Sequence, residues 1–306
     1  MLWEGSLSIL VVGSVALDSV ETPFGKRKDV LGGSATFFSI SASFFNKVDI
    51  VAVVGEDFPK SFLNLLKKRG IGTNGIEIKP GGKTFRWEGR YEYDLNSAHT
   101  IATHLNVFKE FQPKVPEKLN CPDVLFLANI DPELQYKVLA QTKRPRIVAC
   151  DSMNYWIENK HRALRKLISK IDILLLNDAE ARQFSGTSNL IKAARHIVSL
   201  GPKSVVIKKG EHGVIYFSRN SHFIAPAYLL EKVYDPTGAG DTFAGGMMGY
   251  LSKAGTLNDA NMRKAIIHGQ VLASFAVEDF SVNRLLSISM SDIKKRYEHY
   301  TKITRF

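Results

Sequence analysis

The chain has 306 residues, of which 44% are hydrophobic and 23% are charged, so it is long enough to bury a large core. Lys and Arg outnumber Asp and Glu by 41 to 30, which favours anionic ligands. These basic residues are spread along the chain rather than gathered in one arm, and we therefore expect no specific nucleic-acid partner.

Short apolar runs alternate with longer amphipathic stretches along the chain. The expected strands are 9–17, 49–55, 123–129, 146–151, 172–177 and 204–210. The expected helices are 58–70, 132–141, 159–170, 189–201, 241–253, 258–279 and 290–302. Continuously apolar strands separated by helices predict an α/β protein with a parallel sheet that is buried on both faces. No linker or repeat divides the chain, so we expect one domain over 1–306.

Two segments depart from this rhythm. Residues 18–30 and 76–94 have the pattern of strands joined by turns, and the second alternates polar with aromatic residues. Strands inserted among the N-terminal βα units are expected to form a small sheet over one edge of the main sheet, where a lid would lie. The alternative is an edge hairpin without a function.

The other composition signals favour a cytoplasmic protein. Cys121 and Cys150 form no C-x-x-C pair, and the eight His show no zinc-site spacing. No segment has the length of a membrane helix, so we expect no membrane partner. The apolar run at 9–17 follows a flank with Glu4 and without Lys or Arg, which does not fit a signal peptide. A buried first strand explains the run better.

The stretch DPTGAGDTFAGG at 235–246 contains a small-residue turn followed at once by an acid. It fits neither the P-loop nor the dinucleotide fingerprint, because the lysine of the first and the third glycine of the second are missing. A helix that begins at 238–241 would present N–H groups and the positive end of its dipole to an anion. Asp241 is then either the base that takes a proton from an attacking hydroxyl or a helix-capping acid. The residues alone leave both interpretations open.

This stretch resembles the C-terminal signature of the ribokinase-like (PfkB) family of carbohydrate and nucleoside kinases, close to D-[ST]-x-G-A-G-D-x-[FA]. Other landmarks follow in the family's order, so the resemblance covers almost the whole chain. It implies a three-layer α/β/α sandwich with a small β lid. It also implies ATP-dependent phosphoryl transfer to a hydroxyl of a sugar or sugar-like molecule. Asp241 would be the base, and the backbone of Gly238, Ala239 and Gly240 would form the anion hole.

Two landmarks lie near the N-terminus. Asp18, in GSVALD, matches the family's Asp that hydrogen-bonds substrate hydroxyls. Gly32 and Gly33 match the glycine pair that approaches the sugar where a helix begins. The family often carries Asn at the position that Phe37 occupies here, so a ribose pocket does not transfer simply.

A third landmark is N-x-x-E after a central strand. Asn177 and Glu180 match the family residues that orient Mg²⁺ and its waters, and their oxygens suit that ion. The same spacing is also that of an ordinary capping box. Lys208 and Gly210 fall in the family's nucleotide-contacting loop. Lys208 would pair with a phosphate or be an exposed lysine without a specific role.

The C-terminal part adds two weaker correspondences. His268 falls in the region that flanks adenine in the family, with plain helix packing as the alternative. Asp235 and Thr237 match positions that bind a monovalent cation such as K⁺ in some relatives.

The acceptor stays open among neutral sugars, sugar acids and nucleosides, the last as in an adenosine-type kinase. Arg86, in the expected lid, would bind the carboxylate of a sugar acid. Asn129 follows the carboxyl end of an expected strand, where open α/β sheets bind ligands. An aromatic such as Trp87 or Phe37 would instead stack on a nucleoside base.

Two further expectations concern partners and class. Exposed lid strands would pair between subunits, which predicts a homodimer through the lid. The competing classes are a non-catalytic ligand-binding sensor with the same fold and a DNA-binding regulator, the latter favoured by charge alone.

Overall fold

Nine strands form a large sheet in the computed structural model, which describes residues 7–96 and 98–305. Their order is β13-β12-β11-β10-β9-β8-β1-β4-β5, and neighbours pair in parallel except at β11–β12 and β12–β13. The carboxyl ends of the parallel strands therefore share one edge of the sheet. The strands are β1 (Ser8–Val12), β4 (Lys47–Gly55), β5 (Gly72–Lys79), β8 (Val124–Leu127), β9 (Ile147–Asp151), β10 (Ile173–Asn177), β11 (Ser204–Lys208), β12 (Val214–Ser218) and β13 (His222–Ala225).

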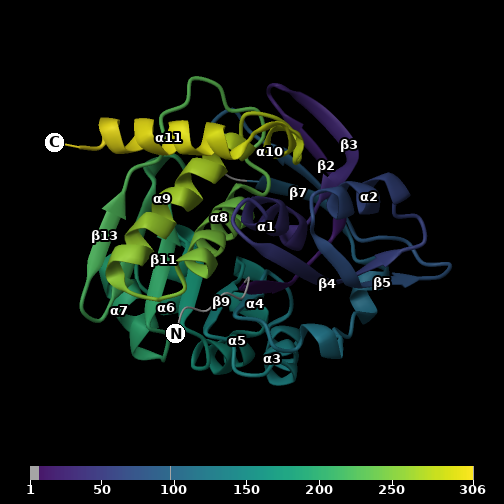
Figure 1. The fold of residues 1–306 in the computed structure, drawn as a ribbon, viewed down its shortest axis with the longest axis horizontal. Coiled ribbons are helices and arrows are strands. Elements are labelled where there is room, and N and C mark those ends of the chain that lie inside the picture. Colours follow the sequence, from purple (N-terminus) through teal and green to yellow (C-terminus); the bar gives the residue numbers. More distant parts are fainter. Residues whose placement is uncertain (1–6, 97, 306) are drawn as a thin grey trace.

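Helices cover both faces of this sheet (Figure 1). Alternate side chains of β1 belong to different clusters, with Ile9 and Val11 on one face and Leu10 and Val12 on the other. The first face carries α1 (Ser34–Ala42), α2 (Lys60–Lys68), α8 (Ala239–Ala254), α9 (Asp259–Ala276), α10 (Asn283–Ser287) and α11 (Met290–Ile303). The second carries α3 (Pro132–Gln141), α4 (Asn154–Asn159), α5 (His161–Ile168), α6 (Asp178–Ser185) and α7 (Leu190–Ser199).

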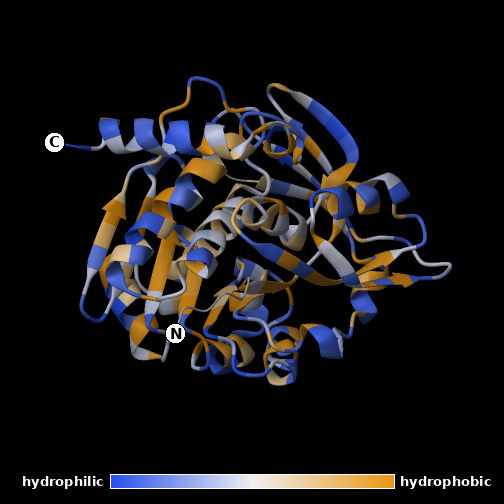
Figure 2. Cartoon of the chain, viewed as in Figure 1, coloured by the Kyte–Doolittle hydropathy of each residue, from blue (hydrophilic) through white to orange (hydrophobic). Residues whose placement is uncertain are grey.

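Hydropathy follows this layering. The strands of the large sheet are the most apolar segments, and the outer faces of the helices are polar (Figure 2). Short 3₁₀ turns complete the connections, at Asn106–Glu110, Glu117–Leu119 and Gly210–His212. The predicted three-layer α/β/α sandwich with a mostly parallel sheet is confirmed.

A second sheet of four strands lies beside the N-terminal part of the large sheet (Figure 1). Its order is β3-β2-β6-β7, with β2 and β6 parallel and the other pairs antiparallel. The strands are β2 (Ala16–Thr22), β3 (Gly25–Gly32), β6 (Arg86–Tyr91) and β7 (Ala98–His104). Residues 18–30 fall in β2 and β3. Of the predicted segment 76–94, only β6 joins this sheet, because β5 pairs with β4 in the large one.

The prediction of one strand over 9–17 is wrong. The chain leaves the large sheet after Val12 and enters the small sheet at Ala16. Between them Gly13 is packed so closely against the start of α1 that a Cβ there would lie 2.8 Å from Oγ of Ser34. Apolar character alone could not reveal this break, because both strands and the turn are buried.

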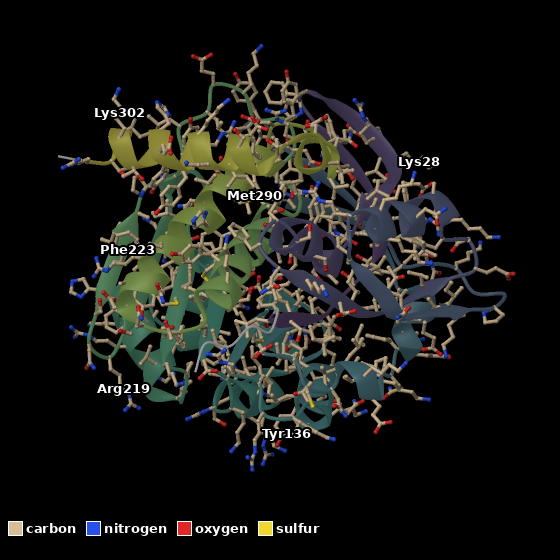
Figure 3. All side chains as sticks on the ribbon, in the orientation of Figure 1. Lys28, Tyr136, Arg219, Phe223, Met290 and Lys302 are labelled. Atoms are coloured by element: carbon tan, nitrogen blue, oxygen red, sulfur yellow. The ribbon has the colours of Figure 1, made fainter. Side chains whose placement is uncertain are left out.

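The basic residues lie on separate elements. Lys28 on β3, Arg219 between β12 and β13, and Lys302 on α11 are exposed at distant edges of the molecule (Figure 3). Both cysteines are free, Cys121 exposed and Cys150 buried. Within residues 7–96 and 98–305, no helix combines the length and the apolar character needed to cross a bilayer. The flank with Glu4 lies outside the described residues.

Candidate active site

Polar side chains collect where the parallel strands of the large sheet end. Asn129, Asp151, Asn177 and Lys208 lie at or just after the carboxyl ends of β8, β9, β10 and β11. The amide nitrogen of Gln135, on α3, lies within 3.0 Å of carbonyl oxygens at the ends of β8 and β9 and so ties these two ends together. Open α/β sheets bind their ligands at this edge.

The glycine turn before α8 adjoins this edge. Gly238 adopts φ 74°, which favours glycine, and a Cβ there would lie 2.3 Å from the ring of Phe37. The N–H of Ala239 donates to the carbonyl oxygen of Pro236 at 3.1 Å, so it is engaged within the turn. The N–H groups of Gly240 and Asp241 lie in the first helical turn, where a helix supplies no carbonyl partner. These two groups, unlike that of Ala239, are thus not engaged by a carbonyl oxygen of the turn.

Phe37 packs its ring against the glycine turn. Its side chain is only 1% exposed and packs against Gly238. It is therefore not available to stack on a base. Phe37, at the position where the family often has Asn, contacts the glycine turn instead of lining a pocket.

Asp241 is partly buried in the first turn of α8. Burial, together with the charge of Asp151 and against that of Lys208, raises the pKa of its carboxyl to about 7. A carboxyl with this pKa takes up and releases a proton near neutral pH, as a general base requires.

Three ionisable groups next to Asp241 form what we call the Lys208 cluster: Asp151, Glu180 and Lys208. Nζ of Lys208 lies 2.8 Å from Oδ2 of Asp151, and the two side chains are 18% and 6% exposed. Burial by itself would lower the pKa of Lys208, but the neighbouring carboxylates raise it above its ordinary value, so the side chain is charged. The same Nζ lies 3.1 Å from where a Cβ of Gly240 would stand. The ammonium therefore adjoins the glycine turn.

Asp151 was not anticipated as a functional residue. The sequence placed it only at the end of an apolar strand, RIVACD. The signal that could reveal it is an acid at the end of a fully buried strand.

Asn177 and Glu180 make the predicted capping box at the start of α6. The side-chain oxygen of Asn177 accepts from the N–H of Glu180, and the N–H of Asn177 donates to Oε2 of Glu180, both at 2.7 Å. Burial raises the pKa of Glu180 to about 7, and the charge of Asp151 adds to the rise. Capping and metal binding are compatible here, because a carboxylate has a second oxygen to offer.

These residues fit a magnesium ion that keeps most of its waters. Glu180 and Asp241 both interact with the charge of Asp151, which raises their pKa values, and with that of Lys208, which opposes the rise. Among the described residues, no three His, Cys, Asp or Glu side chains converge closely enough to hold a metal by themselves. Mg²⁺ typically binds through one or two carboxylates together with phosphates and waters, so both observations agree with it.

Asp241 also interacts electrostatically with Asp18 and Tyr91, which together with Asp235 form what we call the Asp18 cluster. Asp18 is buried, and burial raises the pKa of its carboxyl to about 7 although the N–H of Gly33 donates to it at 3.3 Å. Gly32 allows this close approach, since a Cβ there would lie 1.9 Å from Oδ2 of Asp18. The charges of Asp235 and Asp241 both raise the pKa of Asp18, which places the three acids near one another.

Tyr91 brings the small sheet into this cluster. It is the last residue of β6, and its hydroxyl lies 3.3 Å from Oγ1 of Thr237, next to the glycine turn. Burial raises the pKa of this phenol to about 12, and the acids Asp235, Asp18 and Asp241 contribute. The small sheet therefore reaches over the edge where Asp241 stands.

Asp235 anchors the chain before that turn. Its carboxylate accepts the N–H of Thr237 at 2.9 Å and that of Ser281 at 3.3 Å. Binding of K⁺ at Asp235 and Thr237 stays a prediction.

Arg86 is engaged within the protein. Its guanidinium contacts Asp29 at 3.1 Å and Asp57 at 2.9 Å, so two carboxylates already neutralise it. The predicted contact to a substrate carboxylate would have to break these ion pairs. Asn129 differs, because its Oδ1 is buried and has no hydrogen-bond partner within the described part of the chain. Such an atom is a natural contact for a ligand hydroxyl.

Gly210 and His268 have contrasting surroundings. Gly210 begins a 3₁₀ turn with φ 56°, and Asn96, from the loop after β6, lies 3.7 Å from where its Cβ would stand. The ring of His268 is stacked between Tyr250 and Tyr297, at 4.6 and 4.5 Å. Burial lowers the pKa of His268 to about 4, so the ring is neutral. Both ring faces are covered by protein, which favours helix packing over the predicted adenine contact.

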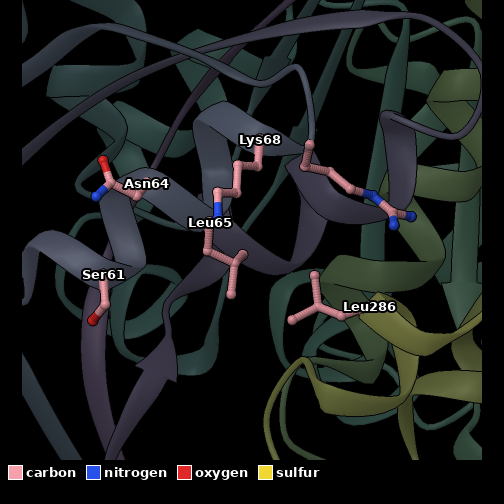
Figure 4. A pocket seen from close by; sticks show the side chains of 6 residues that line it. Ser61, Asn64, Leu65, Lys68 and Leu286 are labelled. Atoms are coloured by element: carbon pink, nitrogen blue, oxygen red, sulfur yellow. The ribbon is translucent and has the colours of Figure 1, made fainter.

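A groove of about 570 Å³ lies elsewhere, between α2 and α10 (Figure 4). It is lined by Ser61, Asn64, Leu65, Lys68, Arg69 and Leu286. None of the polar residues at the strand ends contributes to it, so it is separate from the candidate active site.

The chain is similar to known proteins in sequence and in fold. The family described as pfkB family carbohydrate kinase matches residues 8–288. The chain is 31% identical over 258 residues to the cytidine kinase of Thermococcus kodakarensis, covering 83% of this chain and 91% of the relative.

Two solved structures share the fold. One is a Burkholderia thailandensis nucleoside kinase in complex with inosine, with TM-score 0.79, 19% identity and coverage of 95% of this chain and 97% of that one. The other is described as a ribokinase II from E. coli in complex with ATP and Mg²⁺, with TM-score 0.78, 17% identity and coverage of 96% and 99%. The chain thus belongs to the PfkB family of carbohydrate kinases and is a phosphotransferase.

Proposed function

We propose that this enzyme transfers the γ-phosphoryl group of ATP to a hydroxyl of a nucleoside. The observation that carries the proposal is the position of Asp241, which is electrostatically coupled both to the Lys208 cluster and to the Asp18 cluster. A general base must lie within hydrogen-bond reach of the attacking hydroxyl, and that hydroxyl must in turn adjoin the phosphoryl group that it receives.

The residues take separate roles in this reaction. Asp18 accepts hydrogen bonds from the pentose hydroxyls and so holds the acceptor. Asp241 accepts the proton of the attacking hydroxyl. The N–H groups of Gly240 and Asp241, together with the ammonium of Lys208, stabilise the charge that develops on the phosphoryl oxygens. Phosphoryl transfer depends mainly on such positioning and charge stabilisation.

ATP and Mg²⁺ are expected for kinases of this family, and one structural neighbour was solved with both. Glu180, with Asn177, is the residue pair that would hold the Mg²⁺ and its waters. The ion supplies positive charge to the phosphate oxygens. The turn at Gly210, which follows β11, would lie along the nucleotide.

Two observations favour a nucleoside over the other acceptors. The relative at 31% identity is a cytidine kinase, and one structural neighbour binds inosine. A sugar acid is disfavoured, because Arg86 is already paired with two carboxylates. A neutral sugar such as a free pentose is the second candidate, since Asp18 would bind its hydroxyls equally well.

The test measures ADP release in the presence of Mg·ATP against cytidine, inosine, adenosine, ribose, a hexose and a sugar acid. We expect one of the nucleosides to stimulate release above all other compounds. A sugar acid as the preferred acceptor would contradict the proposed role of Arg86. ATP binding without stimulation by any compound in a wider panel would favour the sensor instead.

We further propose that the chain forms one cytoplasmic kinase domain that dimerises through the small sheet. Static light scattering over micromolar concentrations tests the dimer, and a monomer throughout that range would contradict it.

A further inference from the structure

The ion pair between Asp151 and Lys208 joins two strands that are not neighbours. Strand β10 lies between β9 and β11, so the two backbones are about 10 Å apart. Only a long side chain from β11 can cross the end of β10 and reach a short acid on β9. The pair therefore holds the Lys208 side chain across the strand ends, over β10, at the place where Gly240 adjoins its ammonium.

The pair is costly in terms of stability. Both side chains are largely buried, and removing two charges from water usually offsets the attraction between them. A second Lys–Asp pair offers a comparison at the opposite ends of β10 and β11. There Lys203 contacts Asp172 at the same 2.8 Å; Asp172 is 18% exposed, but the ammonium side chain is 68% exposed and so incurs a smaller cost. Because the Asp151–Lys208 pair adds little to stability, its place at the ligand-binding edge points to a functional role.

Asp151 has a second bond that fixes its orientation. Its Oδ1 accepts the N–H of Ser152 at 2.8 Å, which leaves Oδ2 directed at Lys208. The carboxylate is therefore held from its own backbone, and the ammonium is held from the carboxylate. This series of contacts ends at Gly240 in the first turn of α8, which adjoins the ammonium of Lys208.

We propose that Asp151 is a positioning residue that holds the ammonium of Lys208 against the Gly240 turn, ready to bind the transferring phosphoryl group. Asp151 does not touch the substrate and acts only through Lys208. This inference rests on the proposed kinase reaction, and it assigns a role to a residue that no motif of the chain marks.

The test is a double-mutant cycle with Asp151→Asn, Lys208→Gln and the two combined. We expect Lys208→Gln to lower kcat by about 10²- to 10³-fold, as for the loss of one transition-state donor. Asp151→Asn should lower kcat by about 10- to 100-fold through misplacement of the ammonium. The KM for the acceptor should change less than about twofold in both, because neither residue contacts the acceptor.

Non-additivity is the decisive readout. If Asp151 acts only through Lys208, the combined variant should be no slower than Lys208→Gln alone. Losses that multiply would overturn the inference, as would full kcat in Asp151→Asn. Should Asp151→Asn fail to fold with an unpaired buried ammonium, the combined variant carries neither charge and still gives the comparison with Lys208→Gln. Asp172→Asn is the matched control, and its kcat should stay at the wild-type value.

The same set separates this inference from the proposed function. If the wild type transfers phosphate, Asp241→Asn does not, and Asp151→Asn keeps full kcat, then only the role of Asp151 falls. If the wild type phosphorylates no acceptor, calorimetric titration with Mg·ATP takes the place of turnover. Asp151→Asn should then weaken binding no more than Lys208→Gln does, and the combined variant should bind as Lys208→Gln does; losses that multiply would overturn the inference.

Discussion

The two clusters that interact electrostatically with Asp241 differ in how far they are paired before any ligand binds. In the Lys208 cluster, a charged ammonium is fixed by a carboxylate at 2.8 Å and adjoins the glycine turn. In the Asp18 cluster, a buried carboxyl has one backbone donor at 3.3 Å, and a tyrosine from the small sheet reaches in from the side. The Lys208 cluster is thus already paired before a ligand binds, whereas the carboxyl of Asp18 can accept further hydrogen bonds.

This difference suggests a division of labour. A fixed ammonium and a helix terminus suit a step that every substrate undergoes, the stabilisation of phosphoryl charge. A buried acid with spare acceptor capacity suits the recognition of hydroxyls that differ between acceptors. Changes in the Lys208 cluster should therefore alter kcat, and changes in the Asp18 cluster should alter the KM for the acceptor.

The largest effect is expected at the residue shared by both sides. Asp241→Asn should lower kcat by about 10²- to 10⁴-fold, the usual contribution of a general base, because the amide cannot take up the proton. Binding of Mg·ATP, measured by calorimetry, should change little. Retention of the wild-type kcat would remove Asp241 from the role of base.

A smaller effect is expected in the Asp18 cluster. Asp18→Asn should raise the KM for the acceptor by about 10- to 100-fold, since hydrogen bonds to a charged group are among the stronger ones. The KM for ATP should stay unchanged. Glu21→Gln on the same strand is the control, because Glu21 forms only an exposed ion pair with Lys26. A fall in kcat without a change in acceptor KM would break the division between the clusters.

The pH dependence of stability follows from the raised pKa values of Asp18 and Asp241, both about 7 in the folded state. Each carboxyl binds its proton more tightly when folded than when unfolded. The folded protein therefore holds more protons between about pH 4 and pH 7, and its stability should fall as the pH rises through that range.

Thermal unfolding of the ligand-free protein between pH 5 and pH 8 measures this slope. Asp18→Asn and Asp241→Asn should each flatten it, since the amides do not titrate. A melting temperature that rises with pH in the wild type and is unchanged in slope by both variants would contradict the raised pKa values.

The smallest effect is expected at Tyr91. Tyr91→Phe removes the hydroxyl that contacts Thr237 and should raise the acceptor KM by about 2- to 10-fold, the contribution of one neutral hydrogen bond. Tyr93→Phe, with a side chain that is 87% exposed, is the control. Equal behaviour of the two variants in steady-state kinetics would mean that the small sheet does not act on the acceptor.

Much of this arrangement was readable from the sequence, because local signals carried it. Six strands of the large sheet (β1, β4, β8, β9, β10 and β11) overlap the predicted apolar runs, and the N-x-x-E spacing predicts the capping box at Asn177 and Glu180. The turn at 238–241 was predicted from its glycines. Each of these features depends on residues that are close in sequence, so the local sequence pattern is enough to predict it.

The remainder depends on contacts between distant residues. The residues close to Arg86 in sequence do not indicate that Asp29 and Asp57 form ion pairs with it. The approach of Lys208 to Asp151 results from the order of strands in the sheet, which no single segment encodes. Phe37 gave an aromatic signal, but whether an aromatic faces a pocket or a glycine turn is decided by packing.

The most direct test of the account is single-turnover phosphoryl transfer from Mg·ATP to the best nucleoside acceptor, with wild type, Asp241→Asn, Lys208→Gln and Asp18→Asn in parallel. We predict a slow chemical step for Asp241→Asn and Lys208→Gln even at saturating acceptor. We predict a wild-type chemical step for Asp18→Asn once the acceptor is saturating. Equal slowing in all three variants at saturation would contradict the division between the two clusters.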